Sequence, residues 1–221
     1  MKKYAIILAG GIGARMNSAV PKQLLAIAGE PVLAHVLRRF ENHPQIDGIV
    51  LVMHGDYIGE GERIVRELGM KKILRTVPGG SSRKQSSFNG VAALPRDEEA
   101  CVLIHDAARP FVSERIITDC CNALDKYPAV STVVKSTDTV YIADEEGFIK
   151  EVPDRDFVMM VQTPQCFHYR VIAEAHRLGA ENPELNFTDD AGMVVYYDLA
   201  EVFCIAGEPE NRKITNPGDL G

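Results

Sequence analysis

Short apolar runs rich in β-branched residues recur along this chain, and helical patterns separate them. The runs do not alternate between apolar and polar residues, which is typical of strands buried on both faces of a sheet. We expect strands at 4–9, 48–53, 72–77, 101–105, 129–135 and 201–206. We expect helices at 31–41, 61–68, 82–93, 113–126, 169–177 and 189–197. This order predicts an α/β fold with a mostly parallel sheet, helices on both faces and right-handed crossovers.

The segment 136–160 interrupts this pattern. Two β-prone pieces, DTVYI and FIKEV, flank a polar turn at 143–147, which predicts a hairpin arm that protrudes from the main sheet. An isolated hairpin is only marginally stable in water. This one carries the apolar residues Val140, Tyr141, Ile142, Phe148, Ile149 and Val152. We therefore expect it to dock on its own domain or on a second copy of the chain. No repeat or linker divides the chain, so residues 1–221 are interpreted as a single domain.

Composition excludes several classes of partner. The net charge is −7, which argues against nucleic acid or an anionic membrane as a partner. The five cysteines are odd in number and lack metal-ligand spacing, which argues against a disulfide framework or a zinc site and favours a reducing cytoplasm. The apolar run near the N-terminus ends in glycines after about six residues, too few for a signal-peptide core or a membrane span.

The string LAGGIGARM directly follows the first expected strand, and PKQ follows it. Gly10, Gly11 and Gly13 allow a tight turn that brings backbone N–H groups close to a ligand. Arg15 and Lys22 can then neutralise phosphate oxygens. The spacing matches neither the dinucleotide fingerprint nor the P-loop. A plain strand-to-helix turn with two solvated cations is the alternative.

Two further strings follow expected strands. PGGSSR precedes a helix, where small residues and hydroxyls form an anion or sugar-edge site, although Ser81 or Ser82 could simply cap the helix. HDAARP follows the strand at 101–105, at an edge where parallel sheets bind ligands. There Asp106 could hold Mg²⁺ or a ribose hydroxyl. Alternatively, Asp106 pairs with Arg109 and braces the loop.

Nothing in the sequence indicates a protein nucleophile. His54, His105 and His168 lack ligand-like spacing and are interpreted as structural or exposed rather than catalytic. In the string Thr188-Asp189-Asp190, Thr188 could cap a helix with Asp190 in its first turn, or the string could belong to the site. No convincing Ser–His–Asp or Cys–His arrangement is present. These observations fit phosphoryl-type transfer, which needs positioning and charge neutralisation more than covalent catalysis.

Taken together, these strings resemble the 2-C-methyl-D-erythritol 4-phosphate cytidylyltransferases. LAGGIGARM, PKQ, GGSSR, HDAARP, TDT, DR, QTPQ, TDDA and KIT occur in the family's order across essentially the whole chain. The resemblance implies a Rossmann-like nucleotidyltransferase sandwich, Mg²⁺ dependence, and a cytoplasmic homodimer whose arms, residues 136–160, interlock. The expected reaction transfers CMP from CTP to the methylerythritol phosphate in isoprenoid precursor biosynthesis and releases pyrophosphate.

Two alternatives stay open. LAGG is usual in the related ribitol-5-phosphate cytidylyltransferases, so ribitol 5-phosphate is the alternative polyol phosphate. A domain that senses nucleotide without catalysis would keep the same fold, but the cations that such domains lose first are all present here: Arg15, Lys22, Arg155 and Lys213.

The resemblance also implies a role for each matched residue. The nucleotide would contact Ala9, Gly10, Gly11, Gly13, Gly80, Ser81, Ser86, Asp106 and Ala107. The catalytic cations would be Arg15, Lys22, Lys213 and Arg155, with Lys213 facing the α-phosphate. The polyol phosphate would be bound, partly across the dimer, by Arg109, Thr139, Arg155 and Thr163. Asp106 would also hold the Mg²⁺.

Overall fold

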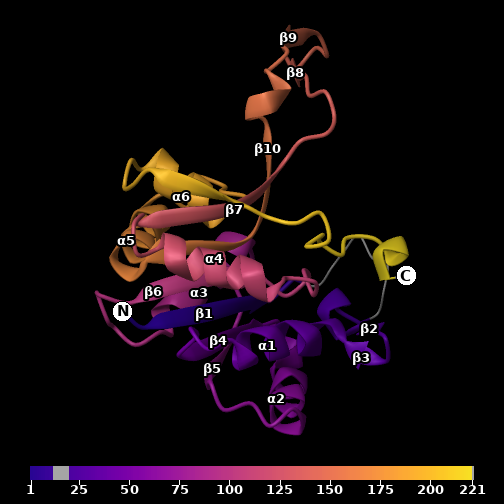
Figure 1. Ribbon diagram of the computed structural model, residues 1–221, viewed down its shortest axis with the longest axis vertical. Coiled ribbons are helices and arrows are strands. Elements are labelled where there is room, and N and C mark those ends of the chain that lie inside the picture. Colours follow the sequence, from indigo (N-terminus) through magenta and orange to yellow (C-terminus); the bar gives the residue numbers. More distant parts are fainter. Residues whose placement is uncertain (12–19, 221) are drawn as a thin grey trace.

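A computed structural model describes residues 1–11 and 20–220, and a seven-stranded sheet forms its centre (Figure 1). The strands are β1 (Lys3–Ala9), β4 (Gly48–Met53), β5 (Ile73–Pro78), β6 (Cys101–Asp106), β7 (Ala129–Lys135), β10 (Met159–His168) and β11 (Val202–Ala206). Their order in space is β11-β7-β10-β6-β1-β4-β5. Adjacent strands are parallel except β10, which runs antiparallel to both β6 and β7. The predicted mostly parallel sheet is confirmed.

Helices cover both faces of this sheet. They are α1 (Val32–Asn42), α2 (Ile58–Glu67), α3 (Arg83–Ala92), α4 (Glu114–Ala123), α5 (Tyr169–Glu181) and α6 (Asp190–Tyr196). Successive side chains of β1 enter opposite cores: Ile7 packs with α1, α2 and α4, and Ile6 packs with α3, α5 and α6. Because strands such as β1 are buried on both faces, they read as continuous apolar runs. Each predicted strand and helix lies within four residues of its observed bounds. No helix of the described residues is long and apolar enough to cross a membrane.

Strand β10 is not predicted from the sequence, which places residues up to 160 in the arm and assigns no strand to the following residues. The string QTPQ looks like a loop because it contains polar residues and a proline. In the structure, the pairing of β10 with β7 shifts register between Val161 and Gln165, so Pro164 lies in an irregularity where its missing N–H is tolerated. The buried amide of Gln162 donates to the Glu208 carbonyl oxygen. A polar strand is therefore accommodated inside the sheet.

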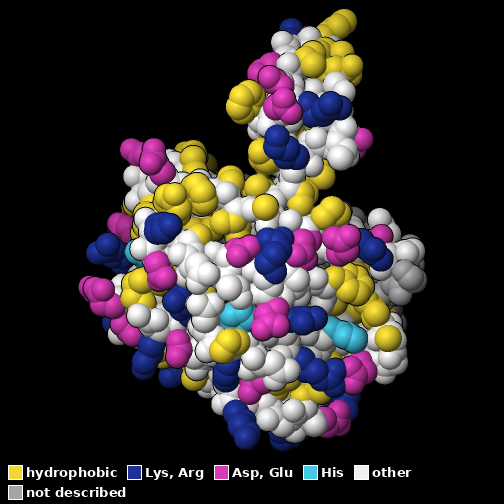
Figure 2. All heavy atoms as spheres, viewed as in Figure 1, with side chains coloured by type: hydrophobic (Ala, Val, Ile, Leu, Met, Phe, Trp, Pro, Cys, Tyr) yellow, Lys and Arg dark blue, Asp and Glu magenta, His cyan; other side chains and the backbone are white. Residues whose placement is uncertain are grey.

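The segment between β7 and β10 projects away from the body of the molecule (Figure 1). In it, β8 (Ile142–Ala143) pairs antiparallel with β9 (Ile149–Glu151), and the 3₁₀-helix η4 (Arg155–Phe157) follows. The Asp144 carboxylate closes the turn by accepting hydrogen bonds from two backbone N–H groups, and Gly147 supplies the positive φ of 91°. Large apolar side chains on this projection are exposed, most of all Phe157 at 82%. Figure 2 shows them as separate from the main body.

Candidate active site

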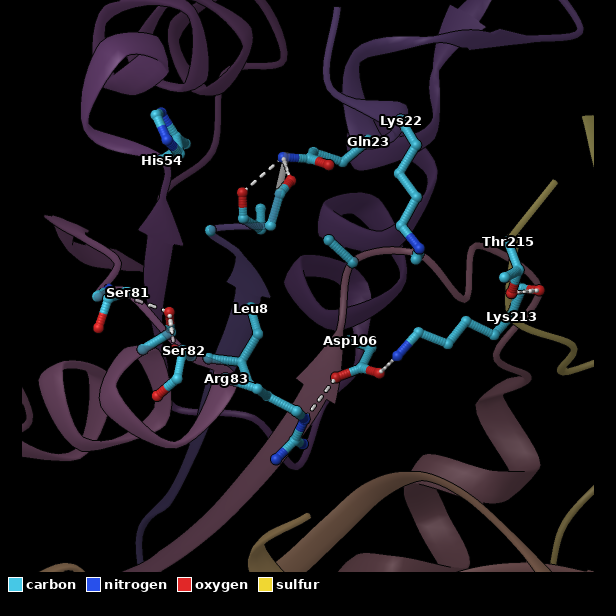
Figure 3. A pocket seen from close by; sticks show the side chains of 17 residues that line it. Leu8, Lys22, Gln23, His54, Ser81, Ser82, Arg83, Asp106, Lys213 and Thr215 are labelled. Atoms are coloured by element: carbon cyan, nitrogen blue, oxygen red, sulfur yellow. Dashed lines mark hydrogen bonds and ion pairs between the residues drawn. The ribbon is translucent and has the colours of Figure 1, made fainter. Parts of the chain in front are cut away.

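A cavity of about 750 Å³ opens where the strands β1, β4, β5 and β6 end at their carboxyl termini. This is the edge at which open parallel sheets bind ligands. Ten residues that the sequence predicts for the site line this cavity: Ala9, Gly10, Gly11, Lys22, Gly80, Ser81, Ser86, Asp106, Ala107 and Lys213. Figure 3 shows the side chains of Lys22, Asp106 and Lys213 pointing toward one another from separate stretches of the chain. Gly13 and Arg15 lie outside the described residues.

The glycine-rich loop is held at its start by Gln23, a residue of the string PKQ whose role the sequence does not indicate. Buried Gln23, in the 3₁₀-helix η2 (Lys22–Leu24), donates from Nε2 to the carbonyl oxygens of Ala9 at 2.6 Å and Gly11 at 3.1 Å. Gly10 lies so close to the loop after β5 that an added Cβ would be 3.1 Å from Oγ of Ser86. A glycine is therefore needed at position 10 for this close approach.

Asp106, the last residue of β6, lies between two cations. Its Oδ2 is 2.6 Å from Nζ of Lys213, and its Oδ1 is 3.3 Å from Nε of Arg83. Burial disfavours the charged carboxylate, but Arg83 and Lys213 outweigh that cost and hold the pKa of Asp106 well below its usual range. Asp106 is therefore ionised at neutral pH. The predicted alternative, an Asp106–Arg109 ion pair, does not form between these described residues.

Arg83 joins Asp106 to a second buried carboxylate, that of Asp190. Arg83 Nη1 lies 2.7 Å from Oδ2 of Asp190, whose side chain is 1% exposed. Ser87 donates to the other oxygen of Asp190 at 2.6 Å, and Nε2 of His176 lies 3.4 Å from it. Burial opposes ionisation of Asp190, but Arg83, His176 and Ser87 together hold its pKa well below the usual range. The string GGSSR contains Arg83 but does not by itself indicate this role; the available signal is the position of Arg83 at a helix start beside a predicted ligand loop.

The two ends of the cavity differ in charge. Lys22, whose Nζ donates to the Ile214 carbonyl oxygen at 2.8 Å, lies on the same side as Lys213 and Thr215. Ser81 and Ser82 line the opposite side (Figure 3). One end thus suits phosphates, and the other suits an uncharged polar group.

On that uncharged side, the loop after β5 is tied to the start of α3. The hydroxyl of Ser86 donates to the Ser82 carbonyl oxygen and accepts from the Gly80 N–H. The hydroxyl of Ser82 accepts from the N–H of Gln85, so it caps α3 as the simpler interpretation of this string expects. The Ser81 side chain is exposed and makes no capping hydrogen bond with the described residues.

Two of the residues predicted to bind the polyol phosphate lie behind Asp106 rather than along the cavity wall. Buried Thr163 accepts the Asp106 N–H at its hydroxyl oxygen and lies 3.1 Å from Nδ1 of His105. Arg109 donates to the carbonyl oxygens of Asn211 and Val161. Burial lowers the pKa of His105 to about 4, so its imidazole is neutral and holds Thr163 and Asp106 in place.

The other two, Thr139 and Arg155, lie on the projecting segment. Both side chains are exposed, and the closest hydrogen-bonding contact of Arg155 is the Thr137 carbonyl oxygen at 3.5 Å. They do not line the cavity of their own chain. The structure therefore does not bring these two residues together with the other predicted site residues.

The described residues contain no cluster of three or more side chains able to hold a metal ion. A divalent cation at this cavity would have the Asp106 carboxylate as its protein ligand and would complete its coordination with ligand phosphates and water. That donor set suits Mg²⁺, which binds through one or two carboxylates together with phosphates. Asp106 is ionised and fixed in place, so it fits this task.

Comparison with known proteins assigns the whole chain to one group. Residues 4–221 match the family model of 2-C-methyl-D-erythritol 4-phosphate cytidylyltransferase (IspD). The relative of that name from Clostridium botulinum strain 657 is 41% identical over 220 residues, which cover 99% of this chain and 94% of the relative. One from Thermobifida fusca is 41% identical, over 98% of this chain and 89% of the relative. The crystal structure of 4-diphosphocytidyl-2C-methyl-D-erythritol synthase from Anaerococcus prevotii superposes with a TM-score of 0.88 at 34% identity, covering 99% and 92% of the two chains.

Proposed function

The chain belongs to the 2-C-methyl-D-erythritol 4-phosphate cytidylyltransferase family, and we propose that its active site is the cavity lined by Lys22, Asp106 and Lys213. The protein transfers CMP from CTP to 2-C-methyl-D-erythritol 4-phosphate and releases pyrophosphate. The relatives match this activity and not the ribitol-5-phosphate alternative, and they equally disfavour a domain without catalysis. The observation that supports the location is the division of the cavity into a cationic and an uncharged end, which matches a nucleoside triphosphate.

The chemistry follows from the charges on both reactants. The acceptor phosphate is already nucleophilic at neutral pH, so attack on the α-phosphorus requires no general base. Lys22 and Lys213 stabilise the negative charge that accumulates there as pyrophosphate leaves. Arg15, outside the described residues, is expected to share this task. Mg²⁺, held by Asp106 and the nucleotide phosphates, would neutralise further charge when bound.

Lys213 has a second function in this proposal. In the structure its ammonium group contacts Asp106, which keeps the cation at the cavity wall before a ligand enters. Arg83 stays on Asp106 from the other side, so the carboxylate keeps one cationic partner when Lys213 turns towards phosphate. The ion pair between Lys213 and Asp106 therefore holds the ammonium group close to where the α-phosphorus reacts, so little reorganisation is needed during the reaction.

The test is pyrophosphate release by the purified chain. With CTP and 2-C-methyl-D-erythritol 4-phosphate we expect turnover, and a chelator of divalent cations should abolish it. ATP, GTP and UTP, and ribitol 5-phosphate as the acceptor, provide the matched comparisons. Faster turnover with ribitol 5-phosphate, or full activity in the chelator, would contradict the acceptor or the metal proposal respectively.

We further propose that the projecting segment 136–160 joins two copies into a homodimer with composite sites. The segment exposes several large apolar side chains, including Tyr141 at 58%, Phe148 at 67% and Phe157 at 82%. They support this proposal because monomeric proteins rarely leave so large an apolar patch exposed to solvent. Arg155, which does not reach its own cavity, would then serve the neighbour's acceptor phosphate.

Mixing inactive variants tests the composite site. Arg155→Ala and Lys22→Ala chains each lack one part of the site, but a heterodimer contains one cavity with both parts intact. We expect partial recovery of activity after the two are mixed, and a dimer by sedimentation. A fully active monomer would contradict the dimer. A dimer without recovery would mean that Arg155 acts within the site of its own chain.

The free thiols of all five cysteines are consistent with the further proposal of a cytoplasmic location.

A further inference from the structure

His54 lies in the active-site cavity, although the sequence pattern indicates only a structural or exposed histidine. It follows β4 directly, and its side chain is 33% exposed. Figure 3 shows it on the same side as Ser81, across the cavity from Lys22 and Lys213. The ring thus stands at the uncharged end, away from the groups that suit phosphates.

The two ring nitrogens of His54 face different surroundings. Nδ1 accepts the backbone N–H of Asp56 at 3.3 Å, which caps the 3₁₀-helix η3 (Gly55–Tyr57). In the neutral ring, the proton must then be on Nε2. Nε2 has no hydrogen-bonding partner among the described residues. The ring also rests edge-on against Tyr57, with centroids 5.9 Å apart, which restricts its orientation. His54 therefore presents a held donor at a ligand cavity.

We propose that His54 contacts the nucleoside part of CTP, with Nε2–H donating a hydrogen bond to it, and that His54 thereby contributes to the affinity for the nucleotide. The inference rests on the proposed function of the cavity. A nucleoside has suitable acceptors in its base carbonyl, ring nitrogen and ribose hydroxyls. The triphosphate has stronger acceptors, but they belong to the cationic end with Lys22 and Lys213.

The competing explanation is that His54 only caps η3, and two substitutions separate the two roles. His54→Asn keeps an acceptor at the cap, where asparagine is among the preferred residues, but it removes the ring and its donor. His54→Gln places an amide N–H near the position of Nε2 but weakens the cap. A binding role predicts that the Asn variant is impaired and the Gln variant is partly spared. A capping role predicts the reverse order.

The experiment measures KM for CTP together with inhibition by CMP and by inorganic tripolyphosphate. In His54→Asn we expect KM for CTP and the inhibition constant of CMP to rise about three- to tenfold, as for one lost hydrogen bond. The inhibition constant of tripolyphosphate, kcat and KM for the acceptor should stay within about twofold, and Tm should be unchanged, because the cap is retained.

Three results would overturn the inference: unchanged CMP and CTP affinity in His54→Asn, an equal loss of tripolyphosphate affinity, or a greater loss in His54→Gln than in His54→Asn. Failure of the proposed function is distinguishable, since the wild-type chain would then release no pyrophosphate from CTP. Calorimetric binding of CMP to wild type and His54→Asn would still decide the role of His54 in that case.

Discussion

Arg83 offers the sharpest test of the electrostatics of this site, because it is the cation between two buried carboxylates. Replacing it with methionine keeps most of the apolar stem and removes the charge that faces Asp106 and Asp190. Asp106 retains Lys213 at 2.6 Å. Asp190 retains Ser87 and His176, but loses the ion pair at 2.7 Å and stays almost completely buried. The cost therefore falls mainly on Asp190.

Removing one partner of a buried ion pair typically costs about 3–5 kcal/mol, because the remaining charge lacks compensation. For a domain of this length, each kcal/mol lowers Tm by about 2–4 °C, so we expect Arg83→Met to lower Tm by roughly 6–20 °C. The measurement is thermal unfolding followed by circular dichroism at pH 7. Arg177→Met is the matched control, since Arg177 also contacts two carboxylates, Glu174 and Glu181, but on the surface, and its Tm should barely change.

The pH dependence of Arg83→Met has a defined sign. In the wild type, the depressed pKa of Asp190 makes a contribution to stability that is present above the pKa of the unfolded chain and is lost only in strong acid. Without Arg83, we expect burial to raise the pKa of Asp190. Acidification then protonates Asp190 and removes the uncompensated buried charge that destabilises the variant. The Tm difference between the two proteins should narrow from pH 7 to about pH 5, and adding Asp190→Asn to Arg83→Met should recover part of the loss. An unchanged Tm in Arg83→Met, or a double variant that is less stable still, would refute this account.

Three further predictions concern other parts of the molecule. Lys22→Ala and Lys213→Ala should each lower kcat about a hundredfold while KM for CTP changes far less, as measured by steady-state pyrophosphate release. A rise in KM for CTP with unchanged kcat would contradict this prediction. Since burial lowers the pKa of His105 to about 4, its imidazole should stay neutral in NMR titrations down to about pH 5.5, and Tm should fall as pH drops below the unfolded value of about 6.5. Phe157→Ser should weaken the proposed dimer in sedimentation experiments, whereas Phe111→Ser, on the main body, should not; equal behaviour of the two variants would argue against the arm as the interface.

The sheet and its helices could be predicted from the sequence because most strands are buried on both faces and are therefore recognisable as apolar runs. It did not predict β10, whose polar side chains are satisfied by residues distant in the chain. Gln165 illustrates this: its amide contacts Ser131 and Asp189, and its oxygen accepts from the backbone of Asp190. No local pattern distinguishes such a buried polar strand from a surface loop.

Most of the predicted nucleotide-binding residues line the cavity, because glycine-rich and charged strings after strands have few structural explanations. The residues whose roles the sequence did not indicate are those whose importance depends on a distant contact. Gln23 acts by holding the glycine loop, and His54 stands in the cavity only because β4 ends beside β1. The residues next to Gln23 and His54 in the sequence form no pattern that indicates these roles.

The string Thr188-Asp189-Asp190 shows how the start of a helix can contribute to a distant charge cluster. A helix begins here with Asp190 in its first turn, as expected, but its cap is Asp189, which accepts the Gly192 N–H at 3.0 Å, and not Thr188. The next carboxylate, of Asp190, pairs with Arg83, 107 residues earlier in the chain. Because the cap fixes where α6 begins, it also fixes where the Asp190 carboxylate stands beneath the active-site cavity. A helix start far from the glycine loop is thus part of the charge balance around Asp106, and that connection is visible only once the fold brings α3 and α6 together.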